Sequence, residues 1–252
     1  MVIRHLLGCV LLSGLFLTAC NTNPKDKKKN GAADSLNNVV KTTYADGKPK
    51  VEIPYKNGKK NGQAKEFYQN GNVFQLIDYV NGKKHGFARR YYETGLIYQE
   101  TPYDSNKIHG VQKKYRADGK LSAEIPYSFG NACAGIKEYT LDGSLKKNYP
   151  SIVIRPVDNI LSRGEYKLVL TMSEKVKEVT YYEGKLTDGK CIGDKTEEIC
   201  CADRSGEADI SFFLPPGQFI MKEINIIAKV KTVQGNYYLT QRNYNVAIEN
   251  RY

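Results

Sequence analysis

Runs of hydrophobic residues broken by polar positions recur at a fixed interval between residues 39 and 150. In one interval, Glu66–Tyr68 and Val73–Ile77 flank the pair Asn70-Gly71. A period of this kind predicts an array of repeats, because such units bury hydrophobic surface only against their neighbours. Glycines and tyrosines each return every 24 residues, at Gly47, Gly71, Gly95, Gly119 and Gly143 and at Tyr55, Tyr79, Tyr103 and Tyr127.

Each unit has the pattern of a β-hairpin. Asn-Gly and Asp-Gly pairs favour a two-residue type I′ turn, because both central residues need a positive φ that Asn, Asp and Gly tolerate. A turn at Asn70-Gly71 predicts that Gly62 lies opposite Tyr79, whose ring then covers the bare glycine backbone. The same register in the next units predicts the pairs Gly86 with Tyr103 and Gly110 with Tyr127.

The register also predicts ion pairs on the opposite face of the sheet. None of these pairs enters the choice of turn, so they support that choice independently. Residues of opposite charge face each other in three hairpins, as Lys41 with Glu52, Arg89 with Glu100 and Lys113 with Glu124.

The repeated phrases resemble a known family. The segment Tyr79-Val80-Asn81-Gly82-Lys83-Lys84-His85-Gly86 combines a Tyr-x-x-Gly element with Asn-Gly-Lys-x-x-Gly, and Pro-Tyr recurs in other units. These motifs resemble the MORN-variant repeat of bacterial proteins described as YwqK-type antitoxins. The resemblance covers about residues 43–150 and implies a single-layer antiparallel sheet that serves as an interaction surface.

Residues 151–252 lack the period and predict a second β-domain. Turn-forming pairs such as Glu183-Gly184 and Gln234-Gly235 separate runs with alternating polar positions. About seven strands in roughly 100 residues favour an immunoglobulin-like β-sandwich. The predicted fold is therefore all-β, a single-layer antiparallel β-hairpin repeat array followed by this sandwich. Strands are expected at 152–154, 166–171, 176–181, near 199, and at 208–214, 223–230 and 236–247.

The N-terminus has the features of a lipoprotein signal peptide over residues 1–19. Its apolar run is too short to span a membrane and ends in Leu17-Thr18-Ala19-Cys20. This ending resembles the bacterial lipobox, which implies lipid attachment at Cys20. Residues 20–38 are polar and rich in lysine, and predict a disordered tether.

The expected location is the cell envelope, with the lipid in the membrane. Asn21 does not resemble the aspartate that retains enterobacterial lipoproteins at the inner membrane, which favours the outer membrane. The net charge is +11, and residues 41–150 carry 19 Lys and Arg against 11 Asp and Glu. This basic excess suits an acidic protein, an acidic polysaccharide or anionic lipid. We do not expect nucleic acid as a partner, because an exported lipoprotein rarely meets it.

One strip of the predicted sheet mixes flat aromatic area with hydrogen-bond donors. Such a strip suits a protein partner or sugar rings. The alternative is that its tyrosines pack over each other, and over Val73 and Ile97, to hold a one-layer sheet together. The candidate binding surface consists of Tyr68, Arg90, Tyr92, Lys114 and Arg116, on the same face as Glu66.

The cysteines beyond the signal region favour a disulfide over a metal. An exported chain meets an oxidising compartment, so we expect Cys191 to pair with Cys200 or Cys201, although spacing alone does not choose the partner and Cys133 is also available. A zinc site is disfavoured, because the Cys-x8-Cys-Cys spacing lacks a Cys-x2-Cys pair and this region has no histidine.

The sequence points to a non-enzymatic protein without a cofactor. It contains no nucleophile elbow and no glycine-rich phosphate loop that precedes a helix. The favoured function is a lipid-anchored interaction or scaffold protein of the cell envelope that acts through a tyrosine-rich, basic repeat surface. Binding of a surface glycan or cell-wall polymer is the first alternative. An antitoxin or immunity role, implied by the family resemblance, is the second.

Overall fold

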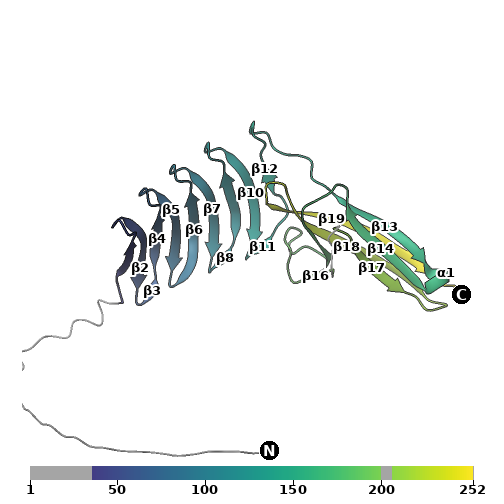
Figure 1. Ribbon diagram of the computed structural model, residues 1–252. Helices are drawn as coiled ribbons and strands as arrows, with labels where there is room; N and C mark the ends of the chain where they lie inside the picture. The colour runs from purple at the N-terminus through teal and green to yellow at the C-terminus, as the bar shows by residue number, and fades with distance from the viewer. Residues whose placement is uncertain (1–35, 200–205, 252) are drawn as a thin grey trace, which may run out of the picture.

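The computed structural model of the protein describes residues 36–199 and 206–251, and it is nearly all β (Figure 1). The expected signal peptide, the expected lipid attachment site at Cys20, most of the expected tether, and both Cys200 and Cys201 lie outside the described residues. Within the described residues, no helix is long and apolar enough to cross a membrane.

The repeat region forms one antiparallel sheet of twelve strands, which Figure 1 shows as a curved row of hairpins. The long strands follow one another in chain order, and β3, β8 and β12 are short strands beside this path. The strands are β1 (Val39–Thr43), β2 (Pro49–Lys56), β3 (Lys59–Lys60), β4 (Gly62–Phe67), β5 (Val73–Val80), β6 (Lys83–Tyr91), β7 (Ile97–Asp104), β8 (Lys107–Ile108), β9 (Gly110–Tyr115), β10 (Leu121–Ser128), β11 (Asn131–Ala132) and β12 (Lys137–Glu138).

The predicted register is confirmed along the body of each hairpin. Gly62 pairs with Tyr79 between β4 and β5, and the equivalent residues pair between β6 and β7 and between β9 and β10. Each paired glycine also has a positive φ. At Gly110 (φ +111°), a Cβ atom would lie 3.1 Å from the ring of Pro102, so the proline column packs on the glycine column of the next unit.

The predicted turn at Asn70-Gly71 is wrong. Tyr68 N–H donates to the carbonyl of Asn72 at 2.8 Å, so the loop holds three residues, and of these only Gly71 has a positive φ. A bulge at Phe74 then adds one residue to β5 and restores the predicted register beyond it. Positive φ at both central residues instead marks the turns between units, at Asn57-Gly58, Asn81-Gly82, Ser105-Asn106 and Phe129-Gly130.

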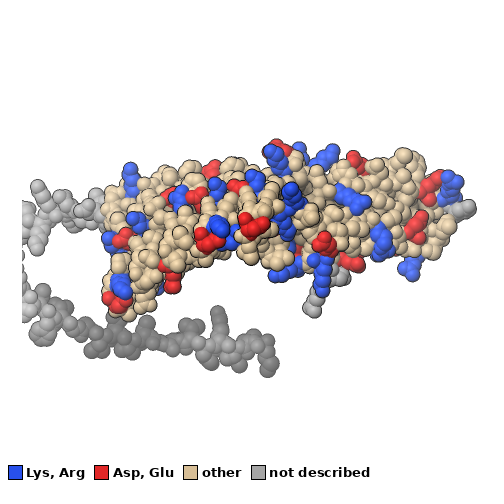
Figure 2. Space-filling model, turned by 90° about the horizontal axis from the view of Figure 1, so that it is seen from above, with Lys and Arg blue, Asp and Glu red and all other residues tan. Residues whose placement is uncertain are grey.

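Charged residues on the face away from the glycines form a row across the hairpins. Two predicted ion pairs are present, Lys41–Glu52 at 2.9 Å and Arg89–Glu100 at 2.7 Å. Lys113 lies opposite Glu124 as predicted, but Glu124 forms its ion pair with Lys137 on the next strand at 3.2 Å. The basic surface expected from the charge count is therefore mixed, and Figure 2 shows acidic and basic side chains interspersed along the array.

The C-terminal region is a β-sandwich of two antiparallel sheets, as predicted. One sheet has the order β13-β14-β17 and the other β16-β15-β18-β19. Its elements are β13 (Ile152–Asn159), α1 (Ile160–Arg163), β14 (Glu165–Met172), β15 (Val179–Gly184), β16 (Thr196–Glu198), β17 (Ala208–Phe213), β18 (Phe219–Lys231) and β19 (Tyr237–Glu249).

The main hydrophobic core lies between these two sheets. Alternate residues of each strand point inward, so Leu168 and Leu170 of β14 pack with Ile224 and Ile226 of β18, all at most 1% exposed. The hydroxyl of the buried Tyr181 donates to the carbonyl of Gly206 at 3.1 Å. The repeat sheet has few fully buried residues by comparison and depends on ties between its units.

Candidate functional site

A column of side chains ties each repeat unit to the next. The hydroxyl of Tyr68 donates to the carbonyl of Tyr91 at 2.7 Å, and that of Tyr92 donates to the carbonyl of Tyr115 at 2.9 Å. Tyr44 makes the same bond to Phe67 one unit earlier. A hydrogen bond of this kind contributes about 1 kcal/mol. The hydroxyls of Tyr68 and Tyr92 therefore hold the array together, while their rings remain available for contacts.

The sheet bulges place a second set of side chains against this column. Phe74 and Tyr98 are the extra residues of two bulges, 24 positions apart, and their rings pack edge-on against Tyr68 at 5.0 Å and Tyr92 at 5.2 Å. The expected contacts with Val73 and Ile97 thus fall one residue later. The sequence analysis did not predict these bulges, although both aromatic residues stand three positions after a turn glycine, Gly71 or Gly95.

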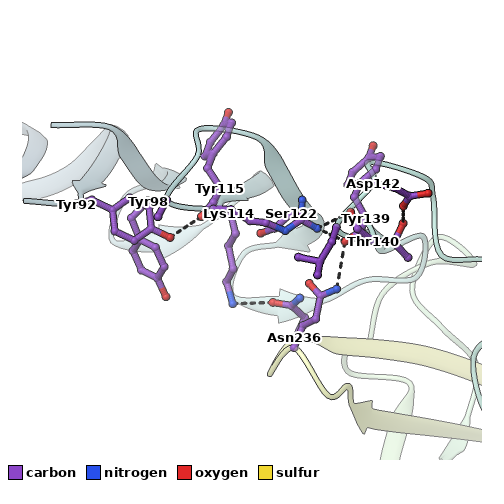
Figure 3. A pocket seen from close by; sticks show the side chains of 13 residues that line it. Tyr92, Tyr98, Lys114, Tyr115, Ser122, Tyr139, Thr140, Asp142 and Asn236 are labelled. Carbon is purple, nitrogen blue, oxygen red and sulfur yellow. Dashed lines mark hydrogen bonds between the residues drawn. The ribbon is translucent and has the colours of Figure 1, made fainter. Parts of the chain in front are cut away.

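The five predicted surface residues divide between two places. Tyr68 and Arg90 lie at Phe74, with the Arg90 guanidinium 5.6 Å from the centre of that ring. Tyr92, Lys114 and Arg116 lie together in an open cleft of about 910 Å³, between the last repeat units and the β18–β19 turn of the sandwich. Figure 3 shows Tyr92 beside Tyr98 and Lys114 extended toward Asn236.

Two cations of the cleft are bound within the protein. Lys114 Nζ donates to Asn236 Oδ1 at 2.6 Å, across the junction between the array and the sandwich. Burial lowers the pKa of Lys114, and the negative charge of Glu138 opposes that shift. The Arg116 guanidinium donates to the carbonyl oxygens of Tyr139 and Thr140. Arg116 thus takes the place of the tyrosine in the column that ties the units.

A buried glutamate fixes the sandwich against the array. The Glu138 side chain is 0% exposed, and its Oε1 accepts from Thr232 Oγ1 at 2.6 Å and from Asn236 Nδ2 at 2.7 Å. Lys146 Nζ lies 3.6 Å from Oε2. Burial, together with the Glu138 charge, raises the pKa of Tyr149 to about 12. This polar junction meets the cleft at Asn236, which lines it.

A disulfide joins the same two regions. Cys133, which follows β11, is bonded to Cys191. The predicted pairing of Cys191 with Cys200 or Cys201 is therefore wrong, because the array brings Cys133 beside the loop that carries Cys191. Backbone hydrogen bonds support this contact, with Ala134 N–H donating to the carbonyl of Lys190 at 2.7 Å.

The surface left open in the cleft is mainly aromatic and apolar. Tyr98 is 38% exposed and Leu141 is 83% exposed, whereas the hydroxyl of Tyr139 donates to Glu124 at 3.1 Å. Hydrogen bonds from Thr140 and Ser144 lower the pKa of Asp142 at the rim. In the part of the chain that the structure describes, no group of three or more His, Cys, Asp and Glu side chains is placed to hold a metal ion.

The repeats match a known family model. The model of the MORN repeat variant matches residues 36–57, 60–81 and 108–128, so the chain contains MORN-variant repeats. These matches correspond to the hairpins β1–β2, β4–β5 and β9–β10, and the hairpin β6–β7 has the same pairing.

Whole proteins similar to this chain do not extend the match to the MORN repeat variant. No curated protein matches the sequence. Among solved structures, the extracellular domain of a one component system from B. thetaiotaomicron is similar with a TM-score of 0.26 and 8% identity, over 89% of this chain and 32% of that one. The chain thus spans about a third of the length of that protein, and a likeness this weak carries no argument.

Proposed function

We propose that the protein is a non-enzymatic interaction protein of the cell envelope, anchored by a lipid at Cys20, which binds a protein partner in the cleft between its repeats and its C-terminal sandwich. The observation that carries the proposal is the cleft itself, which gathers Tyr92, Lys114 and Arg116 around an open aromatic surface. The lipobox-like ending of the signal region supports the envelope location.

The chemistry of the cleft favours a protein partner over a glycan. Sugar recognition needs polar side chains free to bond hydroxyl groups, but Lys114, Arg116 and Tyr92 donate to partners within the chain. The ring of Tyr98 and the side chain of Leu141 are exposed there, with the exposed side chains of Asp142 and Gln234 at the polar rim. Exposed aromatic and aliphatic groups with a polar rim are typical of the centre of a protein interface.

A matched pair of charge substitutions tests this site. Leu141 at the cleft and Leu161 at the far end of the sandwich are 83% and 81% exposed. Leu161 lies beside the exposed Phe213, which makes that end the competing apolar surface. With the full chain as bait in solubilised envelopes, Leu141→Glu should reduce the recovered partner at least tenfold, because a carboxylate would be buried without a counter-ion. Leu161→Glu should leave recovery unchanged.

Either of two results would contradict the proposal. Full recovery with Leu141→Glu would place the partner elsewhere, and loss with Leu161→Glu alone would move the interface to the far end of the sandwich. Thermal unfolding of both variants, followed by circular dichroism, serves as the control for folding. Both leucines are exposed, so both substitutions should leave stability nearly unchanged.

A further inference from the structure

The repeat array has an open edge at its N-terminal end. β1 is the terminal strand of the twelve-stranded sheet, and all five of its residues are exposed. The carbonyl of Asn38 accepts from Tyr55 N–H at 2.7 Å, so even-numbered residues of this strand bond toward β2. Because bonding directions alternate along a strand, the N–H and C=O groups of Val39, Lys41 and Thr43 point outward.

The later units show what an occupied edge looks like. In each later unit, the first strand pairs along this same edge with the last strand of the unit before it. In most of these contacts, a basic residue on the first strand of the later unit faces an acidic residue on the last strand of the earlier unit. In one of them, Lys137 Nζ lies 3.2 Å from Glu124 Oε2. The pairs are Glu52 with Lys65, Glu100 with Lys113 and Glu124 with Lys137.

Lys41 is the equivalent base of the first unit. It precedes Lys65 by 24 residues and is 64% exposed, with Glu52 on its inner side. The hydrogen bond from Lys41, and after it the charges of Lys41 and Lys65, lower the pKa of Glu52, which is the pattern of an acid between two bases. The alternation of the row predicts a further acid on the outer side of Lys41.

We propose that the open edge of β1 binds an extended acidic segment of a partner protein, which adds an antiparallel strand with a carboxylate opposite Lys41. Backbone hydrogen bonds to the outward groups of Val39, Lys41 and Thr43 hold the strand. The charge row selects its sequence, as alternate side chains do in other cases of strand addition.

Charge argues against two other occupants of this edge, a second copy of the protein and the preceding segment of the same chain. Two copies of β1 paired about their centres would place Lys41 opposite Lys41, and like charges in that position are unfavourable. Continuing the array's register one unit backward along the same chain would bring Lys28 opposite Lys41. The edge therefore suits a partner with acidic residues, and it lies at the end of the array away from the sandwich (Figure 1).

A charge-swap experiment tests the edge without using the cleft. The probe is a fluorescent peptide with the sequence of residues 121–128, the array's own acid-bearing strand, and the comparison peptide carries Glu124→Lys. Anisotropy titrations use the full chain as wild type, Lys41→Glu and Lys65→Glu. Lys65 is the matched control, because it lies one unit further in and already has strands on both sides.

The wild type should bind the acidic peptide about fivefold more tightly than the basic one, and Lys41→Glu should reverse that preference. Lys65→Glu should keep the wild-type preference. Val39→Pro, which removes one outward N–H group without a bond to β2, should weaken both peptides. The proposal is overturned if the wild type binds neither peptide at millimolar concentration, or if Lys41→Glu leaves the preference unchanged. Concentration-dependent dimers in sedimentation that Val39→Pro abolishes would identify a second copy as the occupant and also overturn it.

Discussion

Replacing Cys191 with serine should lower the free energy of unfolding by about 4 kcal/mol, which is the chain-entropy value for closing a loop of this size. The bond to Cys133 spans 58 residues and joins the array to the sandwich. Without it, the unfolded chain gains freedom, and the hydrogen bond between Ala134 and Lys190 loses its covalent support. The loss should appear as a lower midpoint of urea unfolding.

Reduction provides the control for this prediction. The reduced wild type should unfold at the same urea concentration as Cys191→Ser, and reductant should leave the variant unchanged. Coincident midpoints for the oxidised wild type and the variant would show that the bond between Cys133 and Cys191 does not form or does not stabilise the fold.

Glu138→Ala should cost about 3 kcal/mol, because removal of one partner from a buried polar cluster leaves the others unsatisfied. Thr232 and Asn236 would lose their shared acceptor, and Lys146 would lose its counter-ion. The Lys114 ammonium would then lie half-buried without the negative charge that opposes the lowering of its pKa. Urea unfolding measures the loss.

The matched control is Glu100→Ala. Glu100 also has a close cation, Arg89 at 2.7 Å, but its side chain is 20% exposed on the surface of the array. Surface ion pairs contribute about 1 kcal/mol or less, so this variant should lose far less than Glu138→Ala. Equal losses in the two variants would mean that Glu138 does not fix the junction.

The repeat sheet was predictable because its signal is local and recurs. Glycine needs no partner far along the chain to specify a sharp bend, and Gly62 and Tyr79 are near neighbours in sequence. The turn type was mistaken because a period can contain two turn signals, as at Asn70-Gly71 and Asn81-Gly82, and only the one between units has a two-residue loop. The bulge at Phe74 supplies the residue that the longer loop removes, so the predicted register survived the error.

The junction was not predictable in the same way. Cys133 and Cys191 belong to different folding units, and no period relates them. Glu138 did carry a signal, since it is the next member, after Lys114, of a column with 24-residue spacing. Its partners Thr232 and Asn236 gave none, because the position of the β18–β19 turn depends on how the whole sandwich packs.

The candidate surface was predicted in part for the wrong reason. Tyr68 and Tyr92 stand on the expected face, but their hydroxyls bond to the backbone of the next unit. Tyr98, which the sequence did not single out, has the more open ring in the cleft. A bulge residue of this kind escapes a strict alternation of faces, which is why alternation alone missed it.

The most direct measurement of the central claim is photocrosslinking in intact cells with benzoylphenylalanine at position 98 or position 87. Tyr98 lies in the cleft and Phe87 on the opposite face of the sheet, and the two are 38% and 39% exposed. Similar exposure makes them a matched pair of probes. The cleft account predicts a crosslinked partner from position 98 and none from position 87. Crosslinks of equal yield from both positions, or from position 87 alone, would contradict it.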